Sequence, residues 1–334
     1  MKVAVFSCKP YDKRTLEAAT QNSSDVELFF FESRLSSETV SLANGFDAIS
    51  CFVNDDLSRD ILEQLSTFGI KAVALRCAGY NNVDLYCAKA LAIPVFHVPD
   101  YSPTSVAEHA VALILTLNRK IHRAYHRVKE GNFALEGLMG FNLEGKTVGC
   151  IGTGRIGQAF CRIMAGFGCR VICYDLAPND ELIEYGAEYV DLETLYADSD
   201  IISLHCPLNA STHHLINKTS LDKMKNGVMI INTSRGALVN AQEAIDGLYN
   251  GKIGHLGLDV YEQEGKFFFE DMSDHIIYDS VFQLLLTFPN VIVTGHQGYF
   301  TDIALRHIAD TTLENLAQLN DAPEHFLREL TNKH

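Results

Sequence analysis

The stretch that decides the fold is VGCIGTGRIGQAF, residues 148–160, in which an apolar strand pattern leads through glycines into a helical pattern. Gly152, Gly154 and Gly157 have the spacing G-x-G-x-x-G. After a strand and before a helix, this spacing is typical of dinucleotide binding. The first glycine permits a tight turn, the second lets a pyrophosphate approach the backbone, and the third lets helix and strand pack closely. The phosphates are then expected on the free N–H groups at the helix start.

The next strand pattern, RVICYD at 170–175, ends in an acidic residue, Asp175. In this position a carboxylate is expected to accept hydrogen bonds from the adenosine ribose. Its charge would repel a 2′-phosphate, so NAD is the predicted cofactor in preference to NADP. Arg155, inside the glycine turn, could contact a phosphate and soften that preference.

Strand and helix patterns alternate on both sides of the glycine turn. The strand candidates are 2–7, 26–31, 48–53, 71–76 and 93–98, then 147–152, 170–175, 201–205, 227–232, 254–260 and 290–295. Such alternation predicts the α/β class, with two doubly wound parallel-sheet domains and a cleft between them. The second series, which holds the glycine turn, is the predicted Rossmann domain.

A long helix is predicted over 104–129, between the two series. Pro103 precedes it, and Thr104 or Ser105 can cap it. Its apolar face at 106–117 can pack as core or against a partner subunit. The apolar run itself is far too short to span a bilayer.

The last predicted helix, 302–319, has no strand after it, so we expect it to return to the first domain. The predicted division is therefore a discontinuous substrate domain, residues 1–100 and 300–334, and a NAD-binding domain, residues 101–299.

Composition narrows the classes of partner and compartment. The chain has 334 residues and a formal charge of −15, which argues against nucleic acid as the main partner because phosphate backbones demand clustered Lys and Arg. The first residues lack the longer apolar core and cleavage site of a signal peptide. Nine cysteines occur without CxxC pairs, which favours reduced thiols in a cytoplasmic protein without a metal or disulfide framework.

Three polar groups follow later strand candidates, at the end of the strands where open α/β sheets bind ligands. NTSRG, GLDVYEQEG and TGHQGYF supply Arg235, Glu264 and His296. An arginine can bind a substrate carboxylate bidentately. A histidine can act as acid or base near neutral pH, and a carboxylate against its far nitrogen would fix its tautomer. Hydride transfer to a carbonyl needs such a proton donor.

With these motifs the chain resembles the D-isomer-specific 2-hydroxyacid dehydrogenases over essentially its full length. The resembling stretches include ALRCAGYNNVDL, AEHAVALILTLNRKIHRAYHR, IGTGRIG, ISLHCPL, MKNGVMIINTSRGALV, LGLDVYE and TGHQGYFT. Within the family it is most similar to bacterial fermentative members that interconvert pyruvate and D-lactate. The resemblance implies that Arg235 binds substrate, that His296 is the acid/base, and that Glu264 is its partner. Glu262 lies in the same loop, but the spacing favours Glu264.

The same resemblance implies further contacts and a flavodoxin-like substrate domain. The backbone of Cys77, Ala78 and Gly79 would help to cradle the carboxylate, with Tyr101 and Phe300 around the methyl group. The residues expected to line the cofactor are Ile156, Cys206, Pro207, Thr233 and Asp259. Family members pair through the nucleotide domains, so a homodimer or homotetramer is expected.

Several alternatives stay open at this point. Arg235 could form a structural salt bridge, and His296 could be an ordinary loop histidine. The substrate could be another small D-2-hydroxy acid, and the chain could instead be a non-enzymatic NAD(H)-sensing corepressor or scaffold. His122 and His126 have i, i+4 spacing, but their basic neighbours disfavour a metal, so no metal site is expected.

Overall fold

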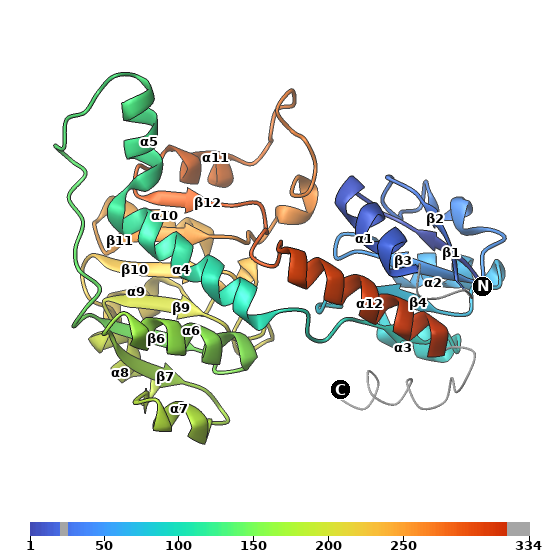
Figure 1. Ribbon diagram of the computed structural model, residues 1–334, viewed down its shortest axis with the longest axis horizontal. Helices are drawn as coiled ribbons and strands as arrows, with labels where there is room; N and C mark the ends of the chain where they lie inside the picture. The colour runs from blue at the N-terminus through green and yellow to red at the C-terminus, as the bar shows by residue number, and fades with distance from the viewer. Residues whose placement is uncertain (21–25, 319–334) are drawn as a thin grey trace. The chain divides into compact units, whose positions relative to one another are not determined.

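The computed structural model describes residues 1–20 and 26–318, which fall into two units (Figure 1). One unit comprises Met1–Ser102 and the described residues from Phe300 onward, and the other comprises Pro103–Tyr299. Each unit has its own parallel sheet with helices on both faces, and this confirms the predicted α/β class with two parallel sheets.

The first unit contains a five-stranded sheet in the order β2-β1-β3-β4-β5. The strands are β1 (Lys2–Val5), β2 (Glu27–Phe30), β3 (Ala48–Cys51), β4 (Val73–Leu75) and β5 (Val95–Phe96). The helices are α1 (Pro10–Thr20), α2 (Arg59–Thr67), α3 (Leu85–Ala90), α12 (Asp302–Gln318) and the short 3-10 helix η1 (Val40–Ala43).

Side chains alternate between two cores in this unit, as the twofold period of a strand requires. Val3 and Val5 pack with Leu16 of α1 and Leu313 of α12, whereas Ala4 lies in the opposite cluster with α2 and α3. Because both faces are covered, the strands are continuous apolar runs. Helix α12 therefore completes one face of the first sheet.

The second unit contains a seven-stranded sheet in the order β12-β11-β10-β9-β6-β7-β8. The strands are β6 (Thr147–Ile151), β7 (Arg170–Tyr174), β8 (Glu188–Tyr189), β9 (Ile201–Leu204), β10 (Val228–Asn232), β11 (Ile253–Leu258) and β12 (Val291–Val293). The order reverses between β6 and β9, the switch point where ligands bind in doubly wound sheets. The edge strand β8 was not predicted, because two residues show no periodicity.

Helices cover both faces of this sheet (Figure 1). One face carries α4 (Pro103–Arg119), α6 (Arg155–Gly166) and α7 (Asp180–Glu184). The other carries α8 (Leu192–Asp198), α9 (Lys218–Lys223), α10 (Ala241–Tyr249) and α11 (Ser280–Thr287), and the 3-10 helices η2 (Gly236–Leu238) and η3 (Glu264–Lys266) lie in loops. In the part of the chain that the structure describes, no helix is long and apolar enough to cross a membrane.

The single helix predicted over 104–129 is wrong in two respects. It begins at Pro103, so Thr104 and Ser105 lie in its first turn instead of capping it; the fixed φ of proline suits the first helical position. The helix also breaks at Lys120, whose φ of 51° is left-handed, and α5 (Ile121–Lys129) follows as a separate helix. No glycine or proline marks this break in the sequence.

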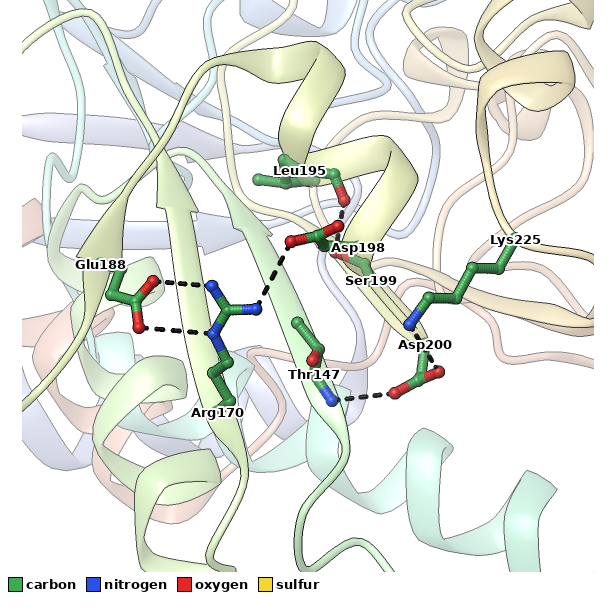
Figure 2. Close-up of polar contacts among 8 residues, drawn as sticks. All are labelled: Thr147, Arg170, Glu188, Leu195, Asp198, Ser199, Asp200 and Lys225. Carbon is green, nitrogen blue, oxygen red and sulfur yellow. Dashed lines mark hydrogen bonds and ion pairs between the residues drawn. The ribbon is translucent and has the colours of Figure 1, made fainter.

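Polar side chains at the amino-terminal ends of β6, β7 and β9 satisfy one another (Figure 2). Arg170 donates to both carboxylate oxygens of Glu188, at 2.8 and 3.3 Å, and to Asp198 at 3.4 Å. Asp200 accepts from the Thr147 N–H at 2.9 Å and pairs with Lys225 at 3.0 Å. Burial raises the pKa of Asp200, but these partners outweigh it and hold the pKa below its ordinary value.

We predict that Asp200→Asn lowers the free energy of unfolding by about 1 kcal/mol at pH 7, because the charge that Lys225 and the β6 backbone bind is lost. Since the folded pKa of Asp200 is lowered, its contribution is complete above the unfolded pKa of about 4 and is lost as pH falls through the folded value. Urea unfolding followed by circular dichroism at several pH values measures this difference.

The matched control is Asp198→Asn, because the Asp198 side chain is 45% exposed in its ion pair with Arg170 and should contribute less than about 0.5 kcal/mol. A cost of Asp200→Asn that is the same at pH 7 and at pH 3 would contradict the assigned role.

Candidate active site

The glycine-rich turn between β6 and α6 leaves space at one glycine only. Gly152 has a φ of 95°, and a Cβ there would lie 2.5 Å from the Cys206 nitrogen; a Cβ on Gly157 would lie 2.0 Å from the Gly152 oxygen. Both glycines are therefore required by the packing of the turn itself. A Cβ on Gly154 would meet nothing within 4 Å, so the open space lies in front of the residue that caps α6.

The start of α6 offers hydrogen-bond donors to an anion. Gly154 is the N-cap residue and has no side chain with which to satisfy the first N–H groups of the helix. Arg155 is exposed and Ile156 is half-buried beside them. Open space and a positive helix end without a capping side chain together fit a pyrophosphate.

Asp175 lies at the carboxyl end of β7, facing the same turn. It accepts hydrogen bonds from the N–H and the hydroxyl of Thr153, and Tyr189 donates to that hydroxyl at 2.9 Å. Burial raises the pKa of Asp175, but hydrogen bonds from the Ala177 backbone and from Thr153 hold it below its ordinary value. The residue is therefore a fixed carboxylate, as a ribose acceptor must be.

The other residues predicted to line the cofactor lie at the carboxyl ends of the neighbouring strands. Cys206 is buried and Pro207 is exposed after β9, while Thr233 follows β10. Thr233 is 7% exposed, and its hydroxyl is buried with no hydrogen-bond partner among the described residues. A buried hydroxyl without a hydrogen-bond partner is energetically unfavourable. The Thr233 hydroxyl is therefore a candidate to form a hydrogen bond with a bound ligand. These residues fit a bound dinucleotide.

The loop after β10 holds Arg235 in a defined conformation. Asn232 accepts from the Ser234 N–H at 3.0 Å and donates to the Arg235 carbonyl at 2.8 Å. The Ser234 hydroxyl donates to the Cys206 carbonyl at 2.8 Å. The half-buried guanidinium of Arg235 donates to the Ser234 carbonyl, but no carboxylate of the described residues forms an ion pair with it. This arginine is available to an external anion.

Gly236, the residue after Arg235, brings two loops into contact. A Cβ at this position would lie 2.1 Å from the Tyr261 carbonyl carbon and 2.2 Å from the Glu262 nitrogen. Only glycine allows this approach, which sets the loop after β10 directly against the loop after β11. The arginine is therefore positioned relative to the segment that leads to Glu264.

Glu264 and His296 form the central pair of this edge. His296 Nδ1 lies 2.6 Å from Glu264 Oε1, and the Tyr261 N–H donates to Glu264 Oε2 at 2.7 Å. The Glu264 side chain is 16% exposed and the His296 side chain is 19% exposed. Because the carboxylate occupies Nδ1, the other ring nitrogen, Nε2, is left to exchange a proton with a ligand.

The imidazole is also held by its backbone and by a neighbouring ring. His296 has a φ of 55°, in the left-handed region that is uncommon for a non-glycine residue. The ring of Phe269 lies 5.6 Å from the His296 ring, centroid to centroid. Strained conformations persist only where the surroundings determine them, and they cluster at functional sites.

His109, a residue of α4, was not identified from the sequence. His109 contacts Asp259, which in turn binds the loop that holds His296. His109 Nε2 lies 3.2 Å from Asp259 Oδ1 and 3.0 Å from the Thr294 hydroxyl. Asp259 accepts from the N–H groups of Gln297 and Gly298 at 2.9 and 2.8 Å. Burial raises the pKa of Asp259, but the bonds from His109 and Thr294 outweigh it and lower the pKa. The signal that could have identified His109 is the presence of a polar residue on the otherwise apolar face of α4.

The remaining predicted residues lie in the first unit. Cys77, Ala78 and Gly79 follow β4, where His97 Nδ1 lies 2.8 Å from the Ala78 oxygen. The Tyr101 carbonyl lies 2.8 Å from His307 Nδ1. Phe300 is 47% exposed and packs edge-on against Tyr11, with ring centroids 4.7 Å apart. Their approach to Arg235 in one pocket stays a prediction.

In chemical terms, the carboxyl edge of the second sheet offers an anion-binding guanidinium and a carboxylate-bound imidazole on adjacent loops, beside a dinucleotide cradle. This combination can bind a carboxylate and exchange one proton with a neighbouring oxygen.

Comparison with known proteins identifies the family of this chain. Residues 111–298 match the model of the D-isomer specific 2-hydroxyacid dehydrogenase NAD binding domain. A D-lactate dehydrogenase of Escherichia coli K12 is 53% identical over 319 residues, which are 96% of this chain and 97% of that protein.

Solved structures agree over the whole length. The pyruvate reductase of Chlamydomonas reinhardtii is 44% identical with a TM-score of 0.92, over 97% of each chain. A D-lactate dehydrogenase with NAD⁺ from Lactobacillus jensenii is 33% identical with a TM-score of 0.81, over 98% of this chain and 99% of that one. The chain therefore belongs to the NAD-dependent D-isomer-specific 2-hydroxyacid dehydrogenases.

Proposed function

We propose that the protein catalyses the reversible, NAD-dependent reduction of pyruvate to D-lactate. The observation that carries the proposal is the pairing of His296 with Glu264 on the same sheet edge as Arg235, a half-buried arginine without an acidic partner among the described residues. Relatives with about half of their residues identical are D-lactate dehydrogenases.

Each residue of this set has one role in the proposed reaction. When bound, the nicotinamide supplies or accepts the hydride. Arg235 binds the substrate carboxylate with its planar fork and polarises the adjacent carbonyl. In reduction, His296 donates the proton from Nε2 to the carbonyl oxygen, and Glu264 stabilises the imidazolium through Nδ1. In lactate oxidation, the neutral ring accepts the hydroxyl proton.

The first unit is proposed as the substrate domain and the second as the NAD-binding domain. The backbone of Cys77, Ala78 and Gly79 would contact the substrate carboxylate. Tyr101 and Phe300 would contact the methyl group, and their rings suit a small apolar tail. Asp175 would accept from the adenosine ribose, with NAD favoured over NADP.

We further propose a cytoplasmic homodimer or homotetramer that pairs through the nucleotide domains, with α4 and α5 contributing. Three apolar side chains of α5, Ile121, Tyr125 and Val128, are more than half exposed, as those of an interface helix would be in a single chain. All nine cysteines are free thiols, which suits a reducing compartment.

The decisive experiment follows NADH absorbance with a panel of 2-keto acids and determines the configuration of the product by chiral chromatography. We expect pyruvate to have a high kcat/KM, a longer or branched tail to lower it, and the product to be D-lactate. No loss of NADH with any keto acid would favour a non-enzymatic NAD(H) sensor, and an L product would contradict the proposal.

Replacing Asp175 by Ser should raise the KM for NADH by about tenfold, because hydrogen bonds to a charged acceptor are lost, and should narrow the gap between NADH and NADPH. Steady-state kinetics with both cofactors measure the change, and Asp180→Ser, at an exposed position at the start of α7, is the control. Equal discrimination before and after the change at Asp175 would show that it does not bind the ribose.

Arg235→Lys keeps the charge but loses the planar fork, which a lysine does not replace. We expect kcat/KM for pyruvate to fall about 10–100-fold, equivalent to one charge-assisted hydrogen bond, while NADH binding measured by fluorescence is unchanged. Arg162→Lys, on α6 and ion-paired with Glu181, should have no effect. Retained pyruvate kinetics in Arg235→Lys would rule out the role given to this arginine.

A further inference from the structure

Two histidines and a glutamate outside the proposed catalytic set meet at the carboxyl edge of the second sheet. They are His213 and His214, in the loop after β9, and Glu262, in the loop after β11. We propose that these three residues bind one divalent transition-metal ion, with Zn²⁺ as the representative ion.

The backbone holds His214 in a defined place. The His214 N–H donates to the Ala237 carbonyl at 2.7 Å, and the Asn217 side chain donates to the His214 carbonyl at 2.8 Å. Ile216 then pairs with Val239 in a parallel bridge. His214 has a φ of 50°, a left-handed conformation that persists only where the surroundings impose it. The loop after β9 is thus fastened to the loop after β10.

The carboxylate is placed by the contact that Gly236 permits. The backbone of Tyr261 and Glu262 lies against Gly236, so close that a Cβ on this glycine would clash. The loop after β10 is therefore held on both sides, by the histidine loop and by the glutamate loop. Glu262 and the two histidines therefore come from loops that both contact the loop after β10 through the backbone.

The distances are close to those of a metal site. His214 Nε2 lies 3.2 Å from Glu262 Oε2, and His213 Nε2 lies 3.8 Å from Glu262 Oε1. The ligand atoms of all three lie within 4.8 Å of one another. Around a tetrahedral ion with bonds of about 2.0–2.2 Å, ligand atoms are about 3.3–3.6 Å apart. Small side-chain rotations would therefore complete three of the four positions.

An ion pair without a metal is the competing explanation of this geometry. However, both imidazoles face one carboxylate, and their rings stack at 3.9 Å with an angle of 31° between planes. The carboxylate can accept from both rings, but a metal ion is what requires two imidazole nitrogens and a carboxylate oxygen to converge on one point, as they do here.

The donor set selects the kind of ion. Imidazole nitrogens suit Zn²⁺, Ni²⁺, Co²⁺ and Cu²⁺, whereas Mg²⁺ and Ca²⁺ prefer oxygen ligands. The site is half open to solvent, since His213 and Glu262 are exposed and His214 is half-buried, so water can occupy the fourth position. No motif in the sequence indicates this site, because Glu262 follows His214 by 48 residues.

The test is isothermal titration of the chelator-treated full-length protein with ZnCl₂. We expect one Zn²⁺ per chain, not displaced by excess Mg²⁺. His213→Gln and Glu262→Gln should each lower the affinity by about tenfold or more, since loss even of an outer-shell partner typically costs about 10–100-fold. His275→Gln, at an exposed histidine remote in sequence from the cluster, is the matched control and should bind as wild type does.

Hydrogen exchange with and without Zn²⁺ locates the ion independently of affinity. We expect added protection in peptides that cover 209–217 and 260–264, in wild type but not in Glu262→Gln; NADH fluorescence confirms that the variants are folded. Absence of binding in wild type, equal affinity in the variants, or protection confined to other segments would overturn the proposal.

Discussion

The contact between His296 Nδ1 and Glu264 Oε1, 2.6 Å long, is the interaction on which the proposed chemistry depends. His296 lies in the loop after β12 and Glu264 begins η3, and backbone contacts hold both segments in place. Asp259 binds the N–H groups that follow His296, and Tyr261 donates to Glu264. The same segment lies against Gly236, next to Arg235. One set of contacts therefore positions base, carboxylate and arginine together.

The two edges of the second sheet differ in whether their arginines have acidic partners. At the amino-terminal edge, Arg170 is ion-paired with Glu188 and Asp198 (Figure 2), so its contribution is structural. At the carboxyl edge, Arg235 has no acidic partner among the residues that the structure describes. The Thr233 hydroxyl is buried without a partner there. Groups that a folded protein ordinarily satisfies are thus available at the carboxyl edge, where doubly wound sheets bind ligands.

The sequence predicted much of this arrangement because its signals are local. The glycine spacing, the strand patterns and the three loop motifs each lie within a few residues, and the parallel sheets that they predict are present. The break at Lys120, the two-residue strand β8 and the His109–Asp259 contact were not predictable in this way. Each depends on tertiary packing or on residues distant in the chain. The approach of Tyr101 and Phe300 to the substrate stays a prediction.

The most direct test of the central claim is the pH dependence of kcat/KM, in both directions, for wild type, Glu264→Gln and Glu262→Gln in the presence of a chelator. Glutamine keeps a hydrogen bond to His296 but loses the charge that stabilises the imidazolium. In Glu264→Gln, we therefore predict that the decline of pyruvate reduction with rising pH begins at lower pH and that the rising limb of lactate oxidation shifts the same way. Glu262→Gln should leave both limbs in place. Unmoved limbs in Glu264→Gln, or a shift in Glu262→Gln instead, would contradict the account.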